Sequence, residues 1–139
     1  MPQLNSYLSF DGNCADAMRF YERTLGGKLE ALIANRDSPM AAELPPGSAE
    51  RIMHARMVID GQVLMAGDAM VGQPYEPMKG FSMTLTYPTA AEARRVFEQL
   101  ADGGRVTMPL QQTFWAEIFG AVVDRFGTPW LVNGALVNA

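Results

Sequence analysis

Short runs of alternating apolar and polar residues predict strands on either side of two amphipathic helices. The expected strands are residues 4–10, 29–35, 51–59, 63–68, 105–110, 115–124 and 128–133, and one more at the start of residues 82–104, before the second helix. The first expected helix follows residue 13, where apolar residues recur at helical spacing and form one stripe. This stripe consists of Cys14, Ala17, Met18, Tyr21 and Leu25.

An internal repeat organises these elements. Residues 6–27 resemble residues 82–104 once the two helix starts are aligned, and the order of strand, helix, double glycine and strand agrees in both copies. Chance similarity between two amphipathic helices explains this ordered agreement less well than duplication. The repeat predicts two βαβββ modules, module 1 (1–68) and module 2 (80–139), joined by a connector at 69–79.

Local signals mark the helix ends and the loops. Asn13 is expected to cap the first helix, and Thr89 with Glu92 forms a capping-box pattern at the second. A double glycine follows each helix, as expected at a left-handed exit. The Pro- and Gly-rich segment 36–50 is expected to be a mobile loop.

Strand alternation predicts one polar face in module 1. If Leu4, Leu8 and Phe10 face the helix, Asn5 and Tyr7 point away from it. If Met53, Ala55, Met57 and Ile59 form the helix side of their strand, His54 and Arg56 lie opposite. With Asp68 added, the candidate ligand-binding surface of this half comprises Asn5, Tyr7, His54, Arg56 and Asp68. The alternative is an ordinary strand histidine beside an Arg56–Asp68 ion pair.

Three aromatic residues of module 2, Trp115, Phe119 and Trp130, are the other candidate ligand-binding residues. They can equally be core or interface aromatics. A solvent-facing ring among them favours ligand stacking. The many methionines are expected to fill the core.

Composition excludes several classes of function. The net charge of −4 disfavours a nucleic-acid partner, and no apolar run approaches the length of about 20 residues that a membrane span needs. A single cysteine, Cys14, cannot form an internal disulfide, which fits a cytoplasmic protein. One cysteine and one histidine cannot build a His-rich or Cys-rich zinc site. Cys14 lies on the helix stripe, so we expect a core residue rather than a nucleophile.

Several segments together resemble the vicinal oxygen chelate superfamily, specifically its PhnB-like branch. They are residues 7–17 (YLSFDGNCADA) running into Phe20-Tyr21, residues 54–57 (HARM) with 60–65 (DGQVLM), and residues 109–133 from Pro-Leu to Trp-Leu-Val-Asn. The superfamily contains glyoxalase, bleomycin-resistance and extradiol dioxygenase proteins. The resemblance implies an α+β fold in which two βαβββ modules form an open cup-shaped mixed sheet, and a homodimer.

The resemblance also implies where a metal would sit in metal-using relatives. Those relatives place His, Gln or Glu at four cup-facing positions, which fall here on Asn5, Ala66, Phe81 or Ser82, and Leu131. Most of these side chains offer no donor atom, and the rest are weak neutral ligands. We therefore expect no metal and no cofactor. A replacement site from His54, Asp68 and Glu117 has no support in the spacing.

Some PhnB-like sequences carry a label as demethylubiquinone methyltransferases. An S-adenosylmethionine site of the usual kind needs a glycine-rich turn that opens a helix, whereas the double glycines here follow helices. We therefore expect no such activity.

The sequence favours two functions. The first is a metal-free protein that binds a small molecule, with polar contacts from module 1 and aromatic walls. The second is an enzyme in which His54, helped by Asp68 or Glu117, acts as general acid–base. A divalent-metal enzyme of the glyoxalase or dioxygenase type, and a scaffold whose cup is filled by its own side chains, are the further alternatives.

Overall fold

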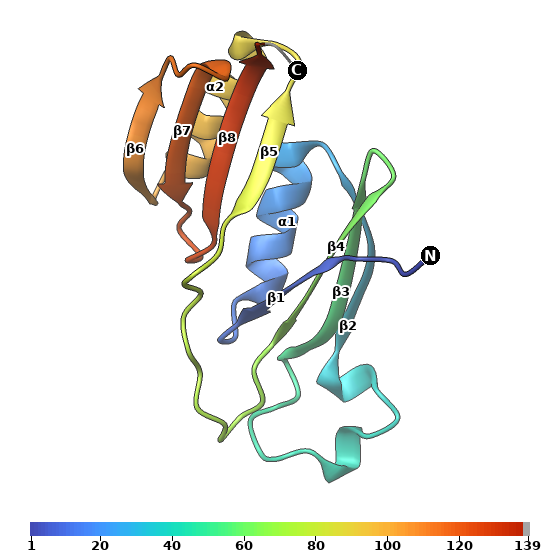
Figure 1. The fold of residues 1–139 in the computed structure, drawn as a ribbon. Coiled ribbons are helices and arrows are strands. Elements are labelled where there is room, and N and C mark those ends of the chain that lie inside the picture. Colours follow the sequence, from blue (N-terminus) through green and yellow to red (C-terminus); the bar gives the residue numbers. More distant parts are fainter. Residues whose placement is uncertain (138–139) are drawn as a thin grey trace. The chain divides into compact units, whose positions relative to one another are not determined.

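The computed structural model describes residues 1–137 (Figure 1). These residues form two compact units, unit 1 up to Glu76 and unit 2 from Pro77 onward. Unit 1 contains a four-stranded mixed sheet and one helix, and unit 2 repeats the same set. No helix within the described residues is both long enough and apolar enough to span a bilayer.

Unit 1 runs strand, helix and three strands. Its elements are β1 (Ser6–Phe10), α1 (Cys14–Leu25), β2 (Lys28–Ala34), β3 (Ile52–Ile59) and β4 (Gln62–Asp68). The strand order is β1-β4-β3-β2, with β1 parallel to β4 and the other pairs antiparallel. Two 3-10 turns, Asn35–Asp37 and Ala41–Glu43, lie between β2 and β3.

Unit 2 has the same topology, which confirms the predicted α+β class and the βαβββ repeat. Its elements are β5 (Met83–Tyr87), α2 (Ala90–Ala101), β6 (Arg105–Gln111), β7 (Ala116–Val123) and β8 (Pro129–Leu136). The strand order is β5-β8-β7-β6, and again the first strand is parallel to the last.

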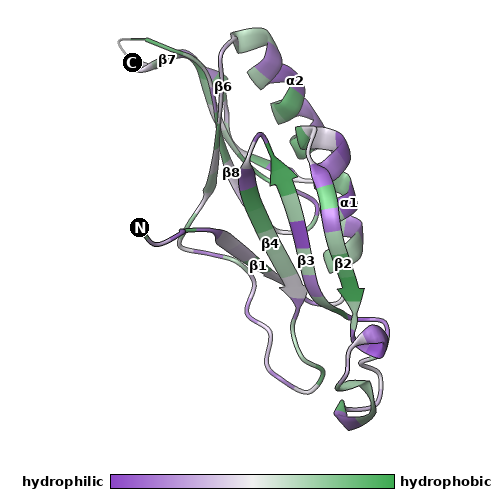
Figure 2. Ribbon diagram, turned by 90° about the vertical axis from the view of Figure 1, so that its right-hand side faces the viewer, coloured by the Kyte–Doolittle hydropathy of each residue, from purple (hydrophilic) through white to green (hydrophobic). Residues whose placement is uncertain are grey.

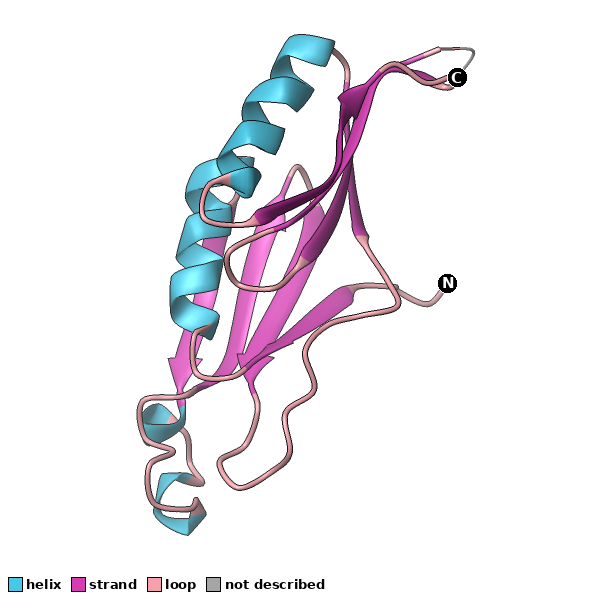
Figure 3. Cartoon of the chain, turned by 90° about the vertical axis from the view of Figure 1, so that its left-hand side faces the viewer, coloured by secondary structure: helices cyan, strands magenta, loops and turns pink. Residues whose placement is uncertain are grey.

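Each helix packs against one face of the sheet in its own unit (Figure 3). Apolar and polar segments alternate along both helices (Figure 2), so one side of each helix is buried and the other is solvated. The buried side chains of unit 1 include Leu8, Phe10, Met18, Tyr21 and Met57. Those of unit 2 include Val96, Phe97, Leu100, Val132 and Trp130. The second face of each sheet, here called the outer face, is left without a helix of its own unit.

One carboxylate joins three parts of unit 1. Asp68 Oδ1 accepts hydrogen bonds from the backbone N–H groups of Gly12 (2.8 Å) and Cys14 (3.0 Å), and Oδ2 accepts one from Ile52 (2.8 Å). The side chain of Asn13, the expected cap, makes no capping bond. Asp68, 54 positions from Cys14 in the sequence, therefore accepts a hydrogen bond at the N-terminal end of α1, where the helix dipole is positive.

An ion pair strengthens the same junction. Arg51 Nη1 lies 3.0 Å from Asp11 Oδ1 and 2.9 Å from the carbonyl oxygen of Ala69. The segment 36–50, expected to be a mobile loop, is closed at its base by backbone bonds from Asn35 N to Arg51 O (2.8 Å) and from Arg36 N to Ala49 O (3.1 Å). It therefore has more internal structure than its composition indicated.

Helix α2 is capped locally, as its sequence predicts. The backbone N–H of Glu92 donates to Thr89 Oγ1 at 3.2 Å, and the Thr89 hydroxyl donates to the Glu92 carboxylate at 3.1 Å. The expected hydroxyl half of the capping box is confirmed.

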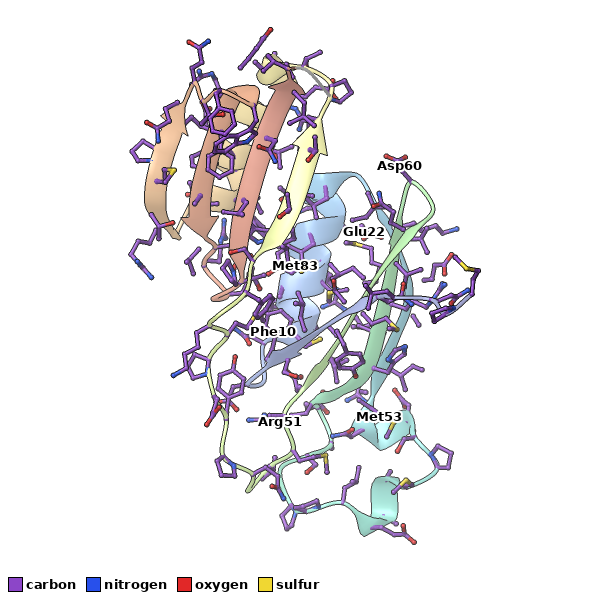
Figure 4. All side chains as sticks on the ribbon, viewed as in Figure 1. Phe10, Glu22, Arg51, Met53, Asp60 and Met83 are labelled. Atoms are coloured by element: carbon purple, nitrogen blue, oxygen red, sulfur yellow. The ribbon has the colours of Figure 1, made fainter. Side chains whose placement is uncertain are left out.

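Two strand-face predictions in unit 1 are wrong. Leu4 lies before β1 and is fully exposed, because β1 starts only at Ser6. Met53 was expected to face α1, yet it is exposed, while its neighbour Ile52 is buried. The register skips from Ile33 opposite His54 to Ala34 opposite Ile52, so Met53 is the extra residue of a β-bulge. Figure 4 shows Met53 at the N-terminal end of β3, which comes after the 3-10 turns in the chain.

Replacing Asp68 by asparagine should destabilise the fold strongly. The amide can present only one oxygen, so at least one of the three N–H donors would face an NH2 group. We expect a loss of about 2–4 kcal/mol in the free energy of unfolding, measured by urea denaturation. Glu43→Gln is the matched control because Glu43 is exposed, and it should change stability little. Equal stabilities of the two variants would contradict the assigned role.

The Cys14 thiol gives a second prediction, on alkaline stability. Burial, and then the Asp68 carboxylate, raise the pKa of Cys14 from 9.0 to about 12. Above pH 9 the unfolded chain loses this proton and the folded chain keeps it, so stability that is complete below pH 9 falls as the pH rises toward 12. Between pH 8 and pH 10 we expect Cys14→Ala to lose less stability than the parent, by about 1 kcal/mol.

Thiol labelling provides the control for this prediction. A disulfide reagent should modify Cys14 slowly in the folded protein and rapidly in urea, because the side chain is buried. Rapid labelling of the folded protein at neutral pH would contradict the assignment.

Candidate functional site

The outer face of unit 1 brings together side chains from three strands. The register sets Tyr7 of β1 beside Met65 of β4, and Met65 beside Arg56 of β3. His54 lies two residues before Arg56 on β3 and therefore points to the same face. The predicted grouping of Tyr7, His54 and Arg56 on one face is what the structure shows.

Tyr7 and His54 form the centre of this group. Their rings stack with centroids 6.1 Å apart and planes inclined by 28°. The Tyr7 hydroxyl donates a long hydrogen bond of 3.4 Å to the carbonyl oxygen of Met53, at the bulge. Half of Tyr7 (51%) remains exposed. An aromatic surface with a polar edge is thus presented to solvent.

Gly67 makes room for this arrangement. A Cβ atom at Gly67 would lie 2.7 Å from the Tyr7 hydroxyl oxygen and 3.0 Å from the Met53 carbonyl oxygen, closer than van der Waals contact permits. Because Gly67 has no side chain, the Tyr7 ring can extend across β4 at this position and reach the bulge.

Tyr7 and His54 provide the hydrogen-bonding groups of this stacked pair. Partial burial, and then the neighbouring Cys14, raise the pKa of Tyr7 above its ordinary value of 10.0, so the phenol keeps its proton at neutral pH. Within residues 1–137, the ring nitrogens of His54 make no hydrogen bond. Both remain available to a ligand.

Arg56 is not an isolated positive charge. Its guanidinium forms an ion pair with the carboxylate of Glu30 on β2, and both side chains are about 40% exposed (40% and 42%). Sequence reasoning missed Glu30 because it assigned no faces to the strand at 29–35, where the register shift between Leu29 and Ala31 also interrupts the alternation. The pair leaves this part of the face close to neutral.

The expected place of Asp68 on this face is wrong. Asp68 lies opposite Phe10 in the β1–β4 register, on the side that faces α1, and its oxygens are occupied by three backbone N–H groups. It cannot orient His54 or pair with Arg56. Asn5 is exposed and precedes β1, outside the paired strands.

Unit 2 carries an aromatic cluster on its outer face. The Trp115 ring lies edge to face with Phe119 (centroids 5.1 Å apart, planes at 69°) and with Phe114 (4.9 Å, 84°). The Trp115 indole N–H donates to Asn133 Oδ1 at 3.0 Å. Trp115 is 36% exposed and Phe114 is 87% exposed. The sequence had indicated Trp115 and Phe119, whereas Phe114 and Asn133 were missed.

Trp130 does not belong to this cluster, which corrects the prediction that it forms a ligand wall. It is 2% exposed on the helix side of the sheet, and its indole N–H donates to Asp124 Oδ2 at 2.8 Å. Asp124 Oδ1 accepts from the backbone N–H groups of Phe126 (2.8 Å) and Thr128 (3.1 Å). Trp130 is a core residue tied to the β7–β8 turn.

The positions that metal-using relatives would fill do not offer a donor set. Ala66 was expected to be one of these outward-facing positions, and that is wrong, because it is fully buried on the side of β4 that faces α1. Phe81 and Leu131 have no donor atom, and Asn5 and Ser82 offer only weak neutral oxygens. Within residues 1–137, no three His, Cys, Asp or Glu side chains come together in a way that could hold a metal ion. His54 and Asp68 lie on opposite faces of their sheet, so the replacement site is not assembled in unit 1.

Relatives of known sequence and structure share this fold. The chain is 39% identical over 138 residues to protein YjdN of Escherichia coli (strain K12), covering 94% of this chain and 93% of that protein. The crystal structure of protein PA1353 from Pseudomonas aeruginosa aligns with a TM-score of 0.89 and 47% identity, over 96% of this chain and 97% of the other.

A third relative is the PhnB protein from Bacillus cereus, whose name proposes a 3-demethylubiquinone-9 3-methyltransferase. It aligns with a TM-score of 0.79 and 26% identity, over 95% of this chain and 98% of the other. The family model of the Glyoxalase/Bleomycin resistance protein/Dioxygenase superfamily matches residues 3–132. Together with the paired βαβββ units, these matches show that the chain belongs to the glyoxalase/bleomycin resistance protein/dioxygenase superfamily.

Proposed function

We propose that this protein binds a small planar molecule on the outer face of unit 1 and holds it without a metal ion. The observation that carries the proposal is the stacked Tyr7–His54 pair, in which Tyr7 is half exposed and His54 is partly exposed. Such a pair offers a ring surface for stacking, and His54 adds two hydrogen-bonding nitrogens. This combination of an apolar body and a few fixed polar atoms is typical of ligand sites.

The charges on this face indicate the kind of ligand. Because Glu30 neutralises Arg56, an anionic ligand would have to compete with a carboxylate that is already in place. A neutral heteroaromatic molecule meets no such competition. It can stack on Tyr7 and exchange a hydrogen bond with His54.

General acid–base catalysis by His54 is less well supported than binding. A catalytic histidine is commonly oriented by a carboxylate. The nearby candidates in unit 1 are engaged elsewhere, since Asp68 binds three amides and Glu30 binds Arg56. Without a carboxylate from unit 1 to orient it, His54 is better suited to hydrogen bonding with a ligand than to general acid–base catalysis.

Methyl transfer of the kind named for the Bacillus cereus relative also lacks a site of the usual type in unit 1. The glycine-rich cofactor turns of such enzymes use the free N–H groups at a helix start. At the start of α1 the Asp68 carboxylate already occupies the N–H group of Cys14 and, just before the helix, that of Gly12. Gly26 adopts a positive φ of 75° at the other end of α1, where it ends the helix.

Two features of the biological setting belong to the same proposal. We place the protein in the cytoplasm because its single cysteine is buried and unpaired. We propose a homodimer on the strength of the family resemblance.

A fragment screen tests the proposed ligand face. Neutral heteroaromatic fragments that bind should shift the NMR signals of Tyr7 and His54. We expect Tyr7→Leu and His54→Ala each to weaken these fragments about tenfold, equivalent to about 1.4 kcal/mol. Tyr75→Leu is the matched control, because Tyr75 packs from the connector and donates to the Ser9 carbonyl oxygen (3.2 Å). Fragments that bind the parent and both outer-face variants equally would overturn the proposal.

Metal content is tested separately. Protein purified without chelator should contain less than a stoichiometric amount of any transition metal by native mass spectrometry and elemental analysis, because the expected ligand positions offer at most the weak neutral oxygens of Asn5 and Ser82. One equivalent of nickel, zinc, iron or manganese per chain, lost on treatment with EDTA, would contradict the metal-free proposal.

A further inference from the structure

We propose that the outer face of unit 2 carries a binding surface for organic cations, in particular quaternary ammonium groups. The surface consists of the rings of Phe114, Trp115 and Phe119 together with the carboxylate of Glu117. All four residues belong to unit 2.

The rings are held in place rather than packed away. Trp115 contacts Phe114 on one side and Phe119 on the other, with centroid separations of 4.9 and 5.1 Å. The bond from the indole N–H to Asn133 fixes the orientation of the Trp115 ring. Since that N–H is already satisfied, the ring can offer a ligand its π surface but no hydrogen-bond donor.

The exposure of these rings indicates that they bind a ligand or partner. Phe114 is 87% exposed and adjoins Trp115, so the two form a contiguous apolar patch. Contiguous exposed aromatic side chains mark binding surfaces more often than isolated ones do. The patch is therefore a candidate binding surface.

Charge selects a cation. Ala116 and Ile118 are buried, so alternation directs Glu117 to the same side of β7 as Phe119. Glu117 is exposed and has no ion-pair partner within the described residues. The patch therefore combines the negative faces of aromatic rings with an available carboxylate, and both attract positive charge.

The basic residues on the strands and turns of unit 2 lie at the other end of the sheet. Arg105 is opposite Val123, where β7 ends, and Arg125 follows in the next turn and pairs with Asp102. At the Phe119 end the neighbouring residues on β6 and β8 are the neutral amides Gln111 and Asn133. At this end of the described sheet an anion would find no cationic side chain on β6, β7 or β8, whereas an organic cation would find complementary charge.

A quaternary ammonium suits this surface better than a small inorganic cation. Its methyl groups are weakly hydrated and contact aromatic faces directly, as in the aromatic cages that recognise choline and methylated lysine. A compact metal ion would require several oxygen ligands, and the patch supplies one carboxylate.

The test uses choline and its neutral isostere 3,3-dimethyl-1-butanol as probes. The protein has two tryptophans, so the NMR spectrum contains one indole N–H signal from Trp115 and one from the buried Trp130 as an internal control. With ionic strength held constant by sodium chloride, choline should shift the Trp115 signal saturably and leave the Trp130 signal in place. The neutral isostere should bind at least about tenfold more weakly.

Two variants and a control complete the experiment. Phe114→Leu and Glu117→Gln should each weaken choline binding about three- to tenfold, because each removes one source of attraction for a cation. Glu98→Gln, an exposed charge change on α2, should leave it unchanged. An unchanged Trp130 signal shows that each variant is folded. Equal binding of choline and the isostere, or a Trp115 signal that choline does not shift, would overturn the proposal.

Discussion

The contact on which unit 1 depends is the Asp68 carboxylate with its three backbone N–H donors. It joins the end of β4 to the start of α1 and to the first residue of β3, segments that are far apart in the sequence. A helix start whose cap comes from a distant strand can form fully only when the sheet has formed. The helix and the sheet are therefore stabilised together, and Ile52 is fixed at the point where the bulge begins.

The bulge and one glycine then decide what the outer face can do. Because Met53 is the extra residue, its carbonyl oxygen is available to the Tyr7 hydroxyl, and Gly67 leaves space for the ring between them. His54 follows directly and stacks on that ring. The chemistry of this face thus follows from backbone irregularity, and not from a regular strand with polar residues at every second position.

The two units show how one topology supports different surfaces. Both sheets bury one face under a helix, yet the outer face of unit 1 carries a histidine and an ion pair, whereas that of unit 2 carries three aromatic rings. Their helix caps differ in the same way, since Thr89 caps α2 locally and Asp68 caps α1 from a distance. The shared fold therefore does not determine the ligand, which depends on the side chains that each outer face carries.

The sequence by itself determined the elements, the βαβββ repeat, the local cap at Thr89 and the grouping of Tyr7 with His54, because periodicity and nearest-neighbour chemistry are local. Tertiary structure alone decided the rest. Alternation cannot foresee a bulge, so it misplaced Met53. A residue type also does not reveal its partners: Asp68 and Trp130 looked suited to a ligand, but burial required their polar atoms to bind the protein's own groups.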